Sequence, residues 1–371
     1  VAKSEEAVFQ WCVRWWEAAE RPEAELLAVM KHVRFGVMAG GFLRETVGAW
    51  PMLQSAEAQS LLSNAVLPAL DSTKAVPRSG YGPRLIYIVG GIGEDDEEKC
   101  SAVELYDTQN ASWRVMASMT APRSSHGCVA LDGKLYAVGG RGAGLQSLDT
   151  AEVYDLQTDG WQPLAKMSTG RRNCGLAAAG GKIYAVGGYG SGLLESVEAY
   201  DPQLGSWALV ASMSVKYQST VSAVLDGKIY IIGGIRSTPS GIVDMVWVYS
   251  PQADTWQQVA SIPQGLCGHA VTAMGGKIYM TGGYNGGMFS SVYVYDPQAD
   301  AWIQLASMGN ARYNHASAAV DGKLYVFGGK IERYGNEKVL DTVEVYDPVS
   351  DSWAHGPSLT SSRYDMVAVA L

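Results

Sequence analysis

The 371-residue chain has few cysteines, a small share of charged residues and no long apolar run. Its five cysteines are an odd, scattered set without metal-type pair spacing, so we expect reduced thiols in the cytoplasm or nucleus. No apolar run approaches the ~18 residues of a membrane helix, and the acidic start VAKSEEAVFQW lacks the basic region of a signal peptide. The formal charge of −9 argues against a nucleic-acid binder, because phosphate binding needs a basic surface.

Motifs of catalysis and cofactor binding are missing as well. The sequence contains no Gly-rich phosphate loop with its Lys, no His-Glu-x-x-His and no Cys-x-x-Cys. We therefore expect no catalytic residue, no cofactor and no enzymatic activity.

Glycine and aromatic residues are abundant, with 43 Gly, 20 Tyr and 11 Trp, and they recur in a repeat of 46 to 49 residues. This composition is typical of an all-β protein with many tight turns. Each of six copies has a Gly-Gly pair and, farther on, a Tyr followed seven residues later by a Trp. The Gly pairs begin at Gly90, Gly139, Gly187, Gly233, Gly282 and Gly328, and the Tyr–Trp pairs run from Tyr106–Trp113 to Tyr346–Trp353.

Each copy is predicted to form four antiparallel strands. In 267–308, CGHAVTAM is the first strand, GG at 275–276 is a hairpin turn, and KIYMTGG is a second strand buried on both faces. SSVYVYDP and AWIQLASM are the third and fourth. Four strands per repeat of about 50 residues predict a propeller blade, with the Gly pair at the crowded centre and the Tyr and Trp rings between blades.

The two ends of the repeat region are each incomplete. RLIYIVGG (84–91) is a second strand without a first, and RYDMVAVAL (363–371) is a first strand without a second. We predict that they pair and complete one blade, which closes the ring and leaves no free sheet edge.

The Gly pair, the Tyr-x6-Trp spacing and the Arg-x-x-His-like start of the first strand resemble kelch repeats, in six copies over residues 84–371. The resemblance implies an all-β six-bladed kelch β-propeller. Three histidines, His126, His269 and His315, occupy one repeat position whose other occupants are Cys174, Thr220 and Met366. Because this is no uniform ligand set, we interpret the histidines as structural and expect no metal.

Residues 1–70 have a different pattern, with helical stripes of apolar residues and caps, and DSTKAVPRSGYGP (71–83) is a predicted linker. AVFQWCVRW (7–15), ELLAVMKHVRF (25–35) and GGFLRETV (40–47) resemble the C-terminal part of the BACK domain of BTB–BACK–kelch proteins. The alternative is an unrelated small helical bundle.

The candidate binding residues are Arg, Lys and Tyr side chains expected around one opening of the central channel. They stand at the start of the first strands or next to it, or directly after the Gly pairs, and are Arg123, Arg141, Arg171, Arg172, Tyr189, Tyr217, Tyr284, Arg312, Tyr313, Lys330, Arg363 and Tyr364. Such residues supply much interface energy, and a basic opening on an acidic body would attract an acidic peptide. The alternative is that several Arg only brace blades through hydrogen bonds to backbone carbonyls.

In the family that this chain resembles, the propeller holds a target protein while the BTB domain binds a cullin scaffold, and the complex transfers ubiquitin to the target. The resemblance implies the substrate-recognition part of a cullin-type ubiquitin ligase adaptor. It implies cullin contact only through a BTB domain, which these 371 residues lack. The alternatives are an actin- or cytoskeleton-associated kelch scaffold and, less favoured, a propeller enzyme of the copper-oxidase kind.

Overall fold

The computed structural model describes residues 85–94, 100–142, 144, 146–237, 240–333 and 336–371. The chain divides into two units, Val1–Arg84 and Leu85–Leu371. The predicted helical segment over 1–70 and linker over 71–83 lie outside the described residues. In the part of the chain that is described, no helix is long and apolar enough to span a membrane.

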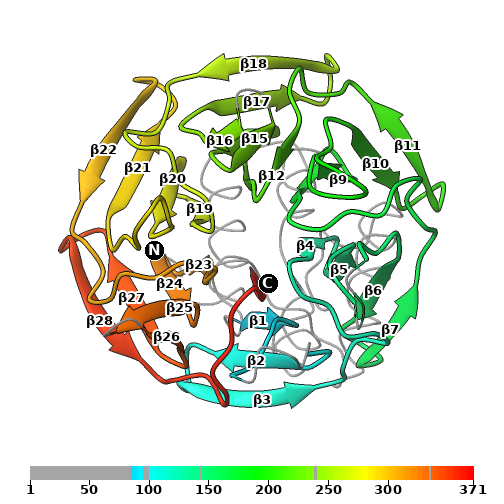
Figure 1. Cartoon of the computed structure of the whole chain (residues 1–371). Helices are drawn as coiled ribbons and strands as arrows, with labels where there is room; N and C mark the ends of the chain where they lie inside the picture. Colours follow the sequence, from blue (N-terminus) through cyan, green and yellow to red (C-terminus); the bar gives the residue numbers. More distant parts are fainter. Residues whose placement is uncertain (1–84, 95–99, 143, 145, 238–239, 334–335) are drawn as a thin grey trace, which may run out of the picture. The chain divides into compact units, whose positions relative to one another are not determined.

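The second unit forms six four-stranded antiparallel sheets, the blades, around a central axis (Figure 1). Blade 1 consists of β29 (Val367–Ala370), β1 (Leu85–Val89), β2 (Val103–Asp107) and β3 (Ser112–Met116). Blade 2 consists of β4 (Gly127–Leu131), β5 (Lys134–Val138), β6 (Ala151–Asp155) and β7 (Gly160–Pro163). Blade 3 consists of β8 (Gly175–Ala179), β9 (Lys182–Val186), β10 (Val197–Asp201) and β11 (Ser206–Val210).

The other three blades follow the same order from the axis outward. Blade 4 consists of β13 (Val221–Leu225), β14 (Lys228–Ile232), β17 (Val246–Ser250) and β18 (Thr255–Val259). Blade 5 consists of β19 (Ala270–Met274), β20 (Lys277–Thr281), β21 (Val292–Asp296) and β22 (Ala301–Leu305). Blade 6 consists of β23 (Ala316–Val320), β24 (Lys323–Phe327), β27 (Val343–Asp347) and β28 (Ser352–Gly356).

The C-terminal strand completes blade 1. β29 pairs antiparallel with β1, with Val367 opposite Val89 and Ala370 opposite Ile86, and it lies between β23 and β4. This is the pairing predicted from the two half motifs. The second strands are buried along nearly their whole length, as their apolar sequences predicted.

Each Gly pair joins its blade to the next one along the chain. A Cβ on Gly139 would lie 2.4 Å from the carbonyl oxygen of Arg171, and both glycines of the pair have positive φ. The second Gly donates its N–H to the carbonyl oxygen of a residue that lies shortly before the first strand of the next blade. Gly140, for example, donates to Arg171 at 2.8 Å. This bond recurs at all six blade boundaries and ends on Arg123, Arg171, Tyr217, Leu266, Arg312 and Arg363, which we call the leading residues.

The repeated Tyr and Trp lie opposite each other in the outer hairpins and fasten the rim. Their ring centroids are 4.8–5.2 Å apart in the six blades. In five blades the indole Nε1 donates to an alanine carbonyl of the preceding blade, as Trp256 does to Ala211 at 2.8 Å. The N–H of Ala211 in turn donates to Asp254, whose carboxylate also accepts from Tyr249.

The boundary between blades 6 and 1 lacks this fastening. Pro357, which has no N–H, stands where the other blades have Ala, and Ala111 stands where four blades have Asp. The buried Nε1 of Trp113 has no hydrogen-bond partner in the described part of the chain. At this boundary the blades are therefore held by strand pairing near the axis and by ring contacts such as Trp113–Phe327, without the rim hydrogen bond.

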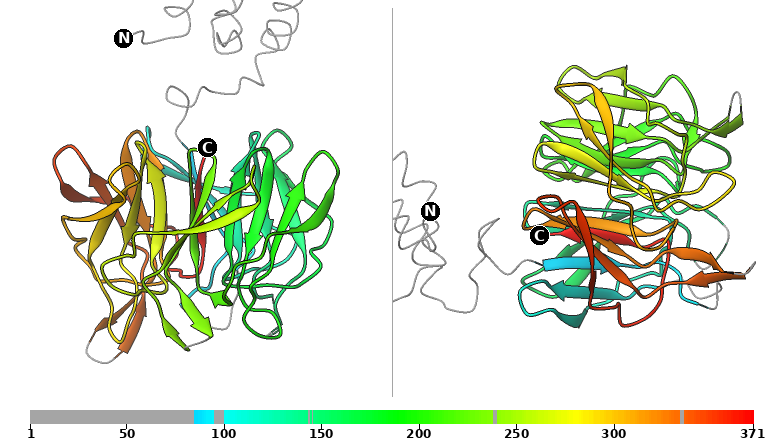
Figure 2. Two further views of the ribbon diagram at one scale, coloured as in Figure 1. Left: turned by 90° about the horizontal axis from the view of Figure 1, so that it is seen from above. Right: turned by 90° about the vertical axis from the view of Figure 1, so that its left-hand side faces the viewer.

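Two smaller sheets project from one face of the propeller (Figure 2). One joins β12 (Tyr217–Gln218), β15 (Ile235–Ser237) and β16 (Ser240–Ile242), and the other joins β25 (Lys330–Arg333) and β26 (Asn336–Val339). Both follow Gly pairs, in blades 4 and 6, where the spacing between repeat elements varies.

Replacement of a rim Trp by Phe provides a test of the indole hydrogen bond. Trp256→Phe should cost about 1 kcal/mol more unfolding free energy than Trp113→Phe, because only the first loses a hydrogen bond. Both variants lose similar ring area, so the difference isolates the bond. Urea unfolding at neutral pH measures it, and equal losses would contradict this account of the rim.

Candidate binding face and central channel

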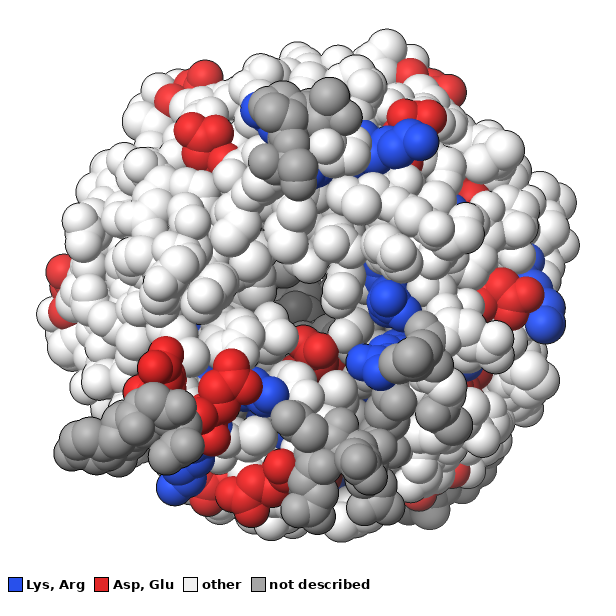
Figure 3. Space-filling view, viewed as in Figure 1, with Lys and Arg blue, Asp and Glu red and all other residues white. Residues whose placement is uncertain are grey.

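One face of the propeller is formed where the first strands begin and the loops after the Gly pairs start. In every blade the residue directly after the leading residue forms a backbone β-bridge with the residue directly after the Gly pair. These pairs are Tyr364–Ile92, Ser124–Arg141, Arg172–Tyr189, Gln218–Ile235, Cys267–Tyr284 and Tyr313–Lys330. We call the surface around them the mouth face; Figure 3 shows it with a hollow at its centre.

Seven of the twelve predicted binding residues lie on the mouth face. They are Arg141, Arg172, Tyr189, Tyr284, Tyr313, Lys330 and Tyr364. The guanidinium carbon of Arg172 is 4.8 Å from the ring centroid of Tyr189, and the ammonium of Lys330 is 4.1 Å from that of Tyr364. Lys330 also forms an ion pair with Glu337 at 3.1 Å. Of the seven, Lys330 and Tyr364 are themselves buried.

The remaining five predicted residues are buried inside the blades, which corrects the expectation that they surround the opening. The exposed fractions of Arg123, Arg171, Arg312, Arg363 and Tyr217 are between 0% and 3%. Each of the four arginines forms an ion pair with a buried glutamate on the third strand of its own blade. The pairs are Arg123–Glu152, Arg171–Glu198, Arg312–Glu344 and Arg363–Glu104.

The geometry of Arg171 shows why these side chains turn inward. Its carbonyl oxygen accepts from Gly140 of the preceding blade, while its guanidinium donates to the carbonyls of Gly187 and Ser196 and to Glu198 at 2.5 Å. The arginines therefore brace their blades through backbone carbonyls, which was the alternative interpretation. In blade 4 the same two positions hold Tyr217 and Trp247, hydrogen-bonded at 3.1 Å, and in blade 5 they hold Leu266 and Tyr293.

Charge on the mouth face is divided between two sides and does not form a basic ring. Four cations lie on the segments of blades 2 to 4 and are Arg141, Arg172, Lys216 and Arg236, whereas Lys330 of blade 6 is buried and ion-paired with Glu337. Exposed acids lie on blades 6 and 1 and include Glu332, Glu337 and Glu94. Figure 3 shows blue patches directly to the right of the hollow and red patches below it and to its lower left, with some blue among the red and further red patches above and to the right, nearer the rim.

A ring of left-handed residues surrounds the throat of the channel, which the sequence reasoning missed. Each lies two positions after a leading residue, and the six are Ser125, Asn173, Ser219, Gly268, Asn314 and Asp365, with φ between 50° and 61°. At five of the six boundaries the N–H of one ring residue donates to the carbonyl of its neighbour at 2.7–3.1 Å. The available signal was the choice of Ser, Asn, Gly and Asp, which tolerate this conformation, at one repeat position.

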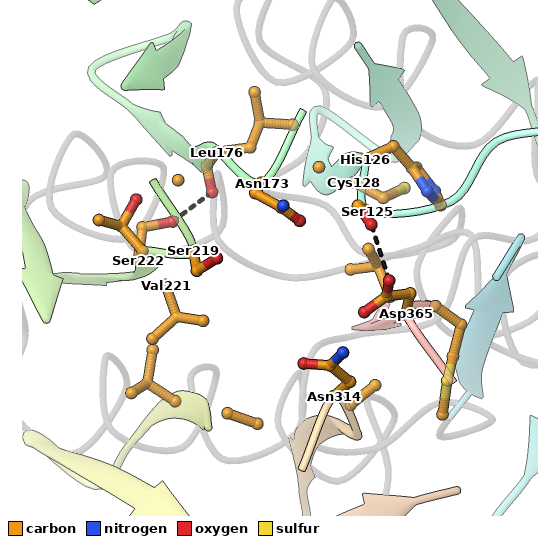
Figure 4. A pocket seen from close by; sticks show the side chains of 18 of the residues that line it. Ser125, His126, Cys128, Asn173, Leu176, Ser219, Val221, Ser222, Asn314 and Asp365 are labelled. Atoms are coloured by element: carbon orange, nitrogen blue, oxygen red, sulfur yellow. Dashed lines mark hydrogen bonds between the residues drawn. The ribbon is translucent and has the colours of Figure 1, made fainter. Parts of the chain in front are cut away.

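The throat opens into a cavity of about 270 Å³, and an adjoining cavity of about 340 Å³ continues along the first strands. Side chains of Asn173, Ser219, Asn314 and Asp365 face the first cavity (Figure 4). Among the described residues lining the two cavities, Asp365 is the only Asp, Glu, Lys or Arg.

The three histidines are buried between blades and are kept neutral by their surroundings. Burial, with a smaller contribution from Arg123, lowers the pKa of His126 to about 3, and burial lowers that of His269 to about 4. Burial also lowers the pKa of His315, whose Nε2 lies 2.8 Å from Thr281 Oγ1. Within the described residues no three His, Cys, Asp or Glu side chains come together as a metal site.

Comparisons with known proteins identify kelch propellers. Residues 86–286 match the family model described as Attractin/LZTR1 beta-propeller, and residues 219–365 match that described as KLHDC2/KLHL20/DRC7 Kelch-repeats domain. Kelch-like ECH-associated protein 1A of Danio rerio is 30% identical over 146 residues, which are 38% of this chain and 24% of the relative. Kelch-like protein 3 of Danio rerio is 31% identical over 149 residues, 37% of this chain and 24% of the relative.

The matched segments thus span about a quarter of the length of these curated relatives. The solved structure titled "Structure of YjhT" superposes with a TM-score of 0.60 at 16% identity, over 76% of this chain and 98% of its own. At that identity the superposition shows a shared fold and nothing more.

The buried ion pairs lead to a first prediction for this region. Arg171→Met should destabilise the protein by about 3–5 kcal/mol, because Glu198 is left buried and unpaired. The double variant Arg171→Leu with Glu198→Tyr copies the pair of blade 5 and should recover most of the loss. Thermal and urea unfolding measure both, and an unchanged stability for Arg171→Met would return this residue to the candidate binding set.

A second prediction concerns the buried histidines and pH. Because the pKa of His126 is about 3 in the folded state and about 6.5 when unfolded, only the unfolded chain takes up this proton as pH falls below 6.5. Stability from this group is therefore complete above pH 6.5 and declines toward pH 3. Between pH 6 and pH 5, His126→Met, which copies Met366, should lose about 1 kcal/mol less unfolding free energy than wild type.

The exposed His355 supplies the control for that measurement. His355→Met should retain the pH dependence of the wild type in urea unfolding. If His126→Met also retains it, His126 does not resist protonation in the folded state.

Proposed function

The chain belongs to the Attractin/LZTR1 beta-propeller family, whose model matches more than half of its residues, and we propose that its propeller binds an acidic segment of a target protein at the mouth face. The observation that supports this most is the pair of partly exposed arginines on the mouth face, Arg141 and Arg172. Arg172 lies over the ring of Tyr189, which holds the guanidinium in place for a carboxylate.

The divided charge of the mouth face gives the bound segment a direction. Its carboxylates would lie over blades 2 to 4, near Arg141, Arg172 and Arg236, and a basic or neutral portion would lie toward Glu332 and Glu337. Like charges on the second side would disfavour an acidic segment in the reverse orientation. The half-buried rings of Tyr189 and Tyr313 and the exposed ring of Tyr284 add apolar contact area with polar tips.

At the cellular level we propose that the propeller is the target-recognition part of a cullin-type ubiquitin ligase adaptor. The proposal is supported by the resemblance to BTB–BACK–kelch proteins and by the two kelch-like relatives. In such an adaptor the propeller only binds and positions the target, in keeping with a mouth face of Arg and Tyr side chains. Cross-linking in cell extract tests this role, because recovery of filament proteins without ubiquitin machinery would favour the cytoskeletal alternative.

Substitution of the mouth arginines tests the binding site itself. For an acidic peptide selected on the wild-type protein from a display library, Arg141→Gln and Arg172→Gln should each weaken binding by about 1–3 kcal/mol and reduce its salt dependence. Fluorescence anisotropy measures the dissociation constant, and Tm should change little because both side chains are partly exposed and neither belongs to a buried ion pair that an arginine of the blades forms.

The matched control is Arg114→Gln on the outer strand β3, where the exposed Arg114 carries the same charge away from the mouth face. It should leave affinity unchanged. Equal losses at positions 114 and 141 would mean that the peptide responds only to the net charge of the protein.

A further inference from the structure

The first strand of blade 1 is joined to its blade differently from the first strands of the other five blades. In blades 2 to 6 a two-residue turn connects the first strand to the second, and the two strands pair at five positions. β29 pairs with β1 at four positions, and no turn connects them, because β1 begins the propeller and β29 ends it. β29 pairs with no other strand of the blade sheet, and one further backbone bond joins Leu371 to Leu85.

The leading arginine of blade 1 also makes fewer hydrogen bonds than its equivalents. The leading arginines of blades 2, 3 and 6 each donate to two backbone carbonyls of their own blade, at the end of the second strand and just before the third. Each also donates to a hydroxyl, and these are on Thr150, Ser196 and Thr342. Within the described residues Arg363 donates only to Glu104 and Ser361, and its Nη1 has no partner. Ala102 stands where the three hydroxyl residues are.

Other contacts keep blade 1 in the ring independently of β29. β1 pairs with β2 at five positions, and the rings of Trp113 and Phe327 meet across the boundary to blade 6 with centroids 6.2 Å apart. The segment just before β29 is bound at the mouth end, where Tyr364 bridges to Ile92 and the N–H of Asp365 donates to a neighbouring carbonyl. Loss of β29 from the sheet would therefore leave the six blades and this segment in place.

We propose that β29 is a detachable wall of the central channel. Ala368, Val369 and Ala370 of this strand line the channel cavity of about 340 Å³. The strand leaves β1 from its Leu371 end, while the residues before it stay bound at the throat. The cavity then extends to the free edge of β1, so detachment widens the channel on the side of blade 1. This inference is independent of the proposed function, because it concerns no residue of the mouth arginines.

Hydrogen–deuterium exchange of the full chain, followed by mass spectrometry, measures this opening. Amides of β29 should exchange at least tenfold faster than those of the five other first strands, because β29 lacks the turn and the arginine bonds that hold them. Its exchange should depend little on urea below the unfolding transition, since a local opening exposes little surface. Equal rates in all six first strands, or a urea dependence equal to that of global unfolding, would overturn the proposal.

A single substitution restores the missing hydroxyl. Ala102→Thr offers Arg363 the acceptor that Thr150 offers Arg123, and it should slow the exchange of β29 about fivefold. The matched control is Thr150→Ala, which removes that acceptor in blade 2, where the turn still joins β4 to β5. Exchange of β4 in this variant should remain slower than that of β29 in the wild type. An unchanged rate for β29 in folded Ala102→Thr protein would contradict the proposed detachment.

A buried thiol beside β29 provides a second readout. Cys128 of β4 belongs to the same buried cluster as Val369, whereas Cys174 of β8 is as well buried but lies outside that cluster. With N-ethylmaleimide on the full chain, Ala102→Thr should slow modification of Cys128 about fivefold and leave that of Cys174 unchanged, as measured by peptide mass spectrometry. Equal slowing at both thiols, or at neither, would count against release of β29 as the event that exposes Cys128.

Discussion

Close approach of neighbouring blades at the axis is the constraint on which the rest of this propeller depends. At each of six boundaries the second Gly of a pair donates its N–H to the carbonyl of the next leading residue, at 2.8–3.0 Å. The first Gly makes room for that carbonyl, since a Cβ on Gly90, Gly139, Gly282 or Gly328 would approach it to 2.4–2.6 Å. A side chain at these positions would separate the blades where the ring is narrowest.

This backbone bond also determines where the leading side chain goes. With its carbonyl fixed to the preceding blade, the residue turns its side chain into its own blade, toward the second residue of the third strand. Three kinds of pair meet there: Arg with Glu in four blades, Tyr217 with Trp247, and Leu266 with Tyr293. At one repeat position, ionic pairs are thus replaced by an aromatic and an apolar pair. This is typical of a contact that braces the blade, in which the fit of the two side chains and the pairing of their polar groups matter more than charge.

Binding chemistry is consequently left to residues that the scaffold does not use. The mouth face carries most of its cations on blades 2 to 4 and exposed acids such as Glu332 and Glu337 on blade 6, and the described lining of the throat carries a single carboxylate. The β12–β15–β16 and β25–β26 sheets add to this face because insertions after the Gly pairs leave the blade contacts intact. Each repeat thereby combines strands that form a rigid ring with a loop after the Gly pair that can vary in length and sequence.

The sequence by itself determined the six repeats, the four strands of each, the Gly pairs, the Tyr–Trp rims and the pairing of 363–371 with 84–91, because these depend on local patterns that recur. It also placed Arg141, Arg172 and Tyr189 among twelve candidate binding residues. Only the tertiary structure decided that Arg123, Arg171, Arg312 and Arg363 are interior, since a strand-leading Arg appears the same in sequence whether it faces solvent or a distant glutamate. That glutamate is 27 to 32 residues away for the first three and 259 residues away for Arg363. The channel charge was equally hidden, because Asp365 is a sole carboxylate only once six separate strands converge.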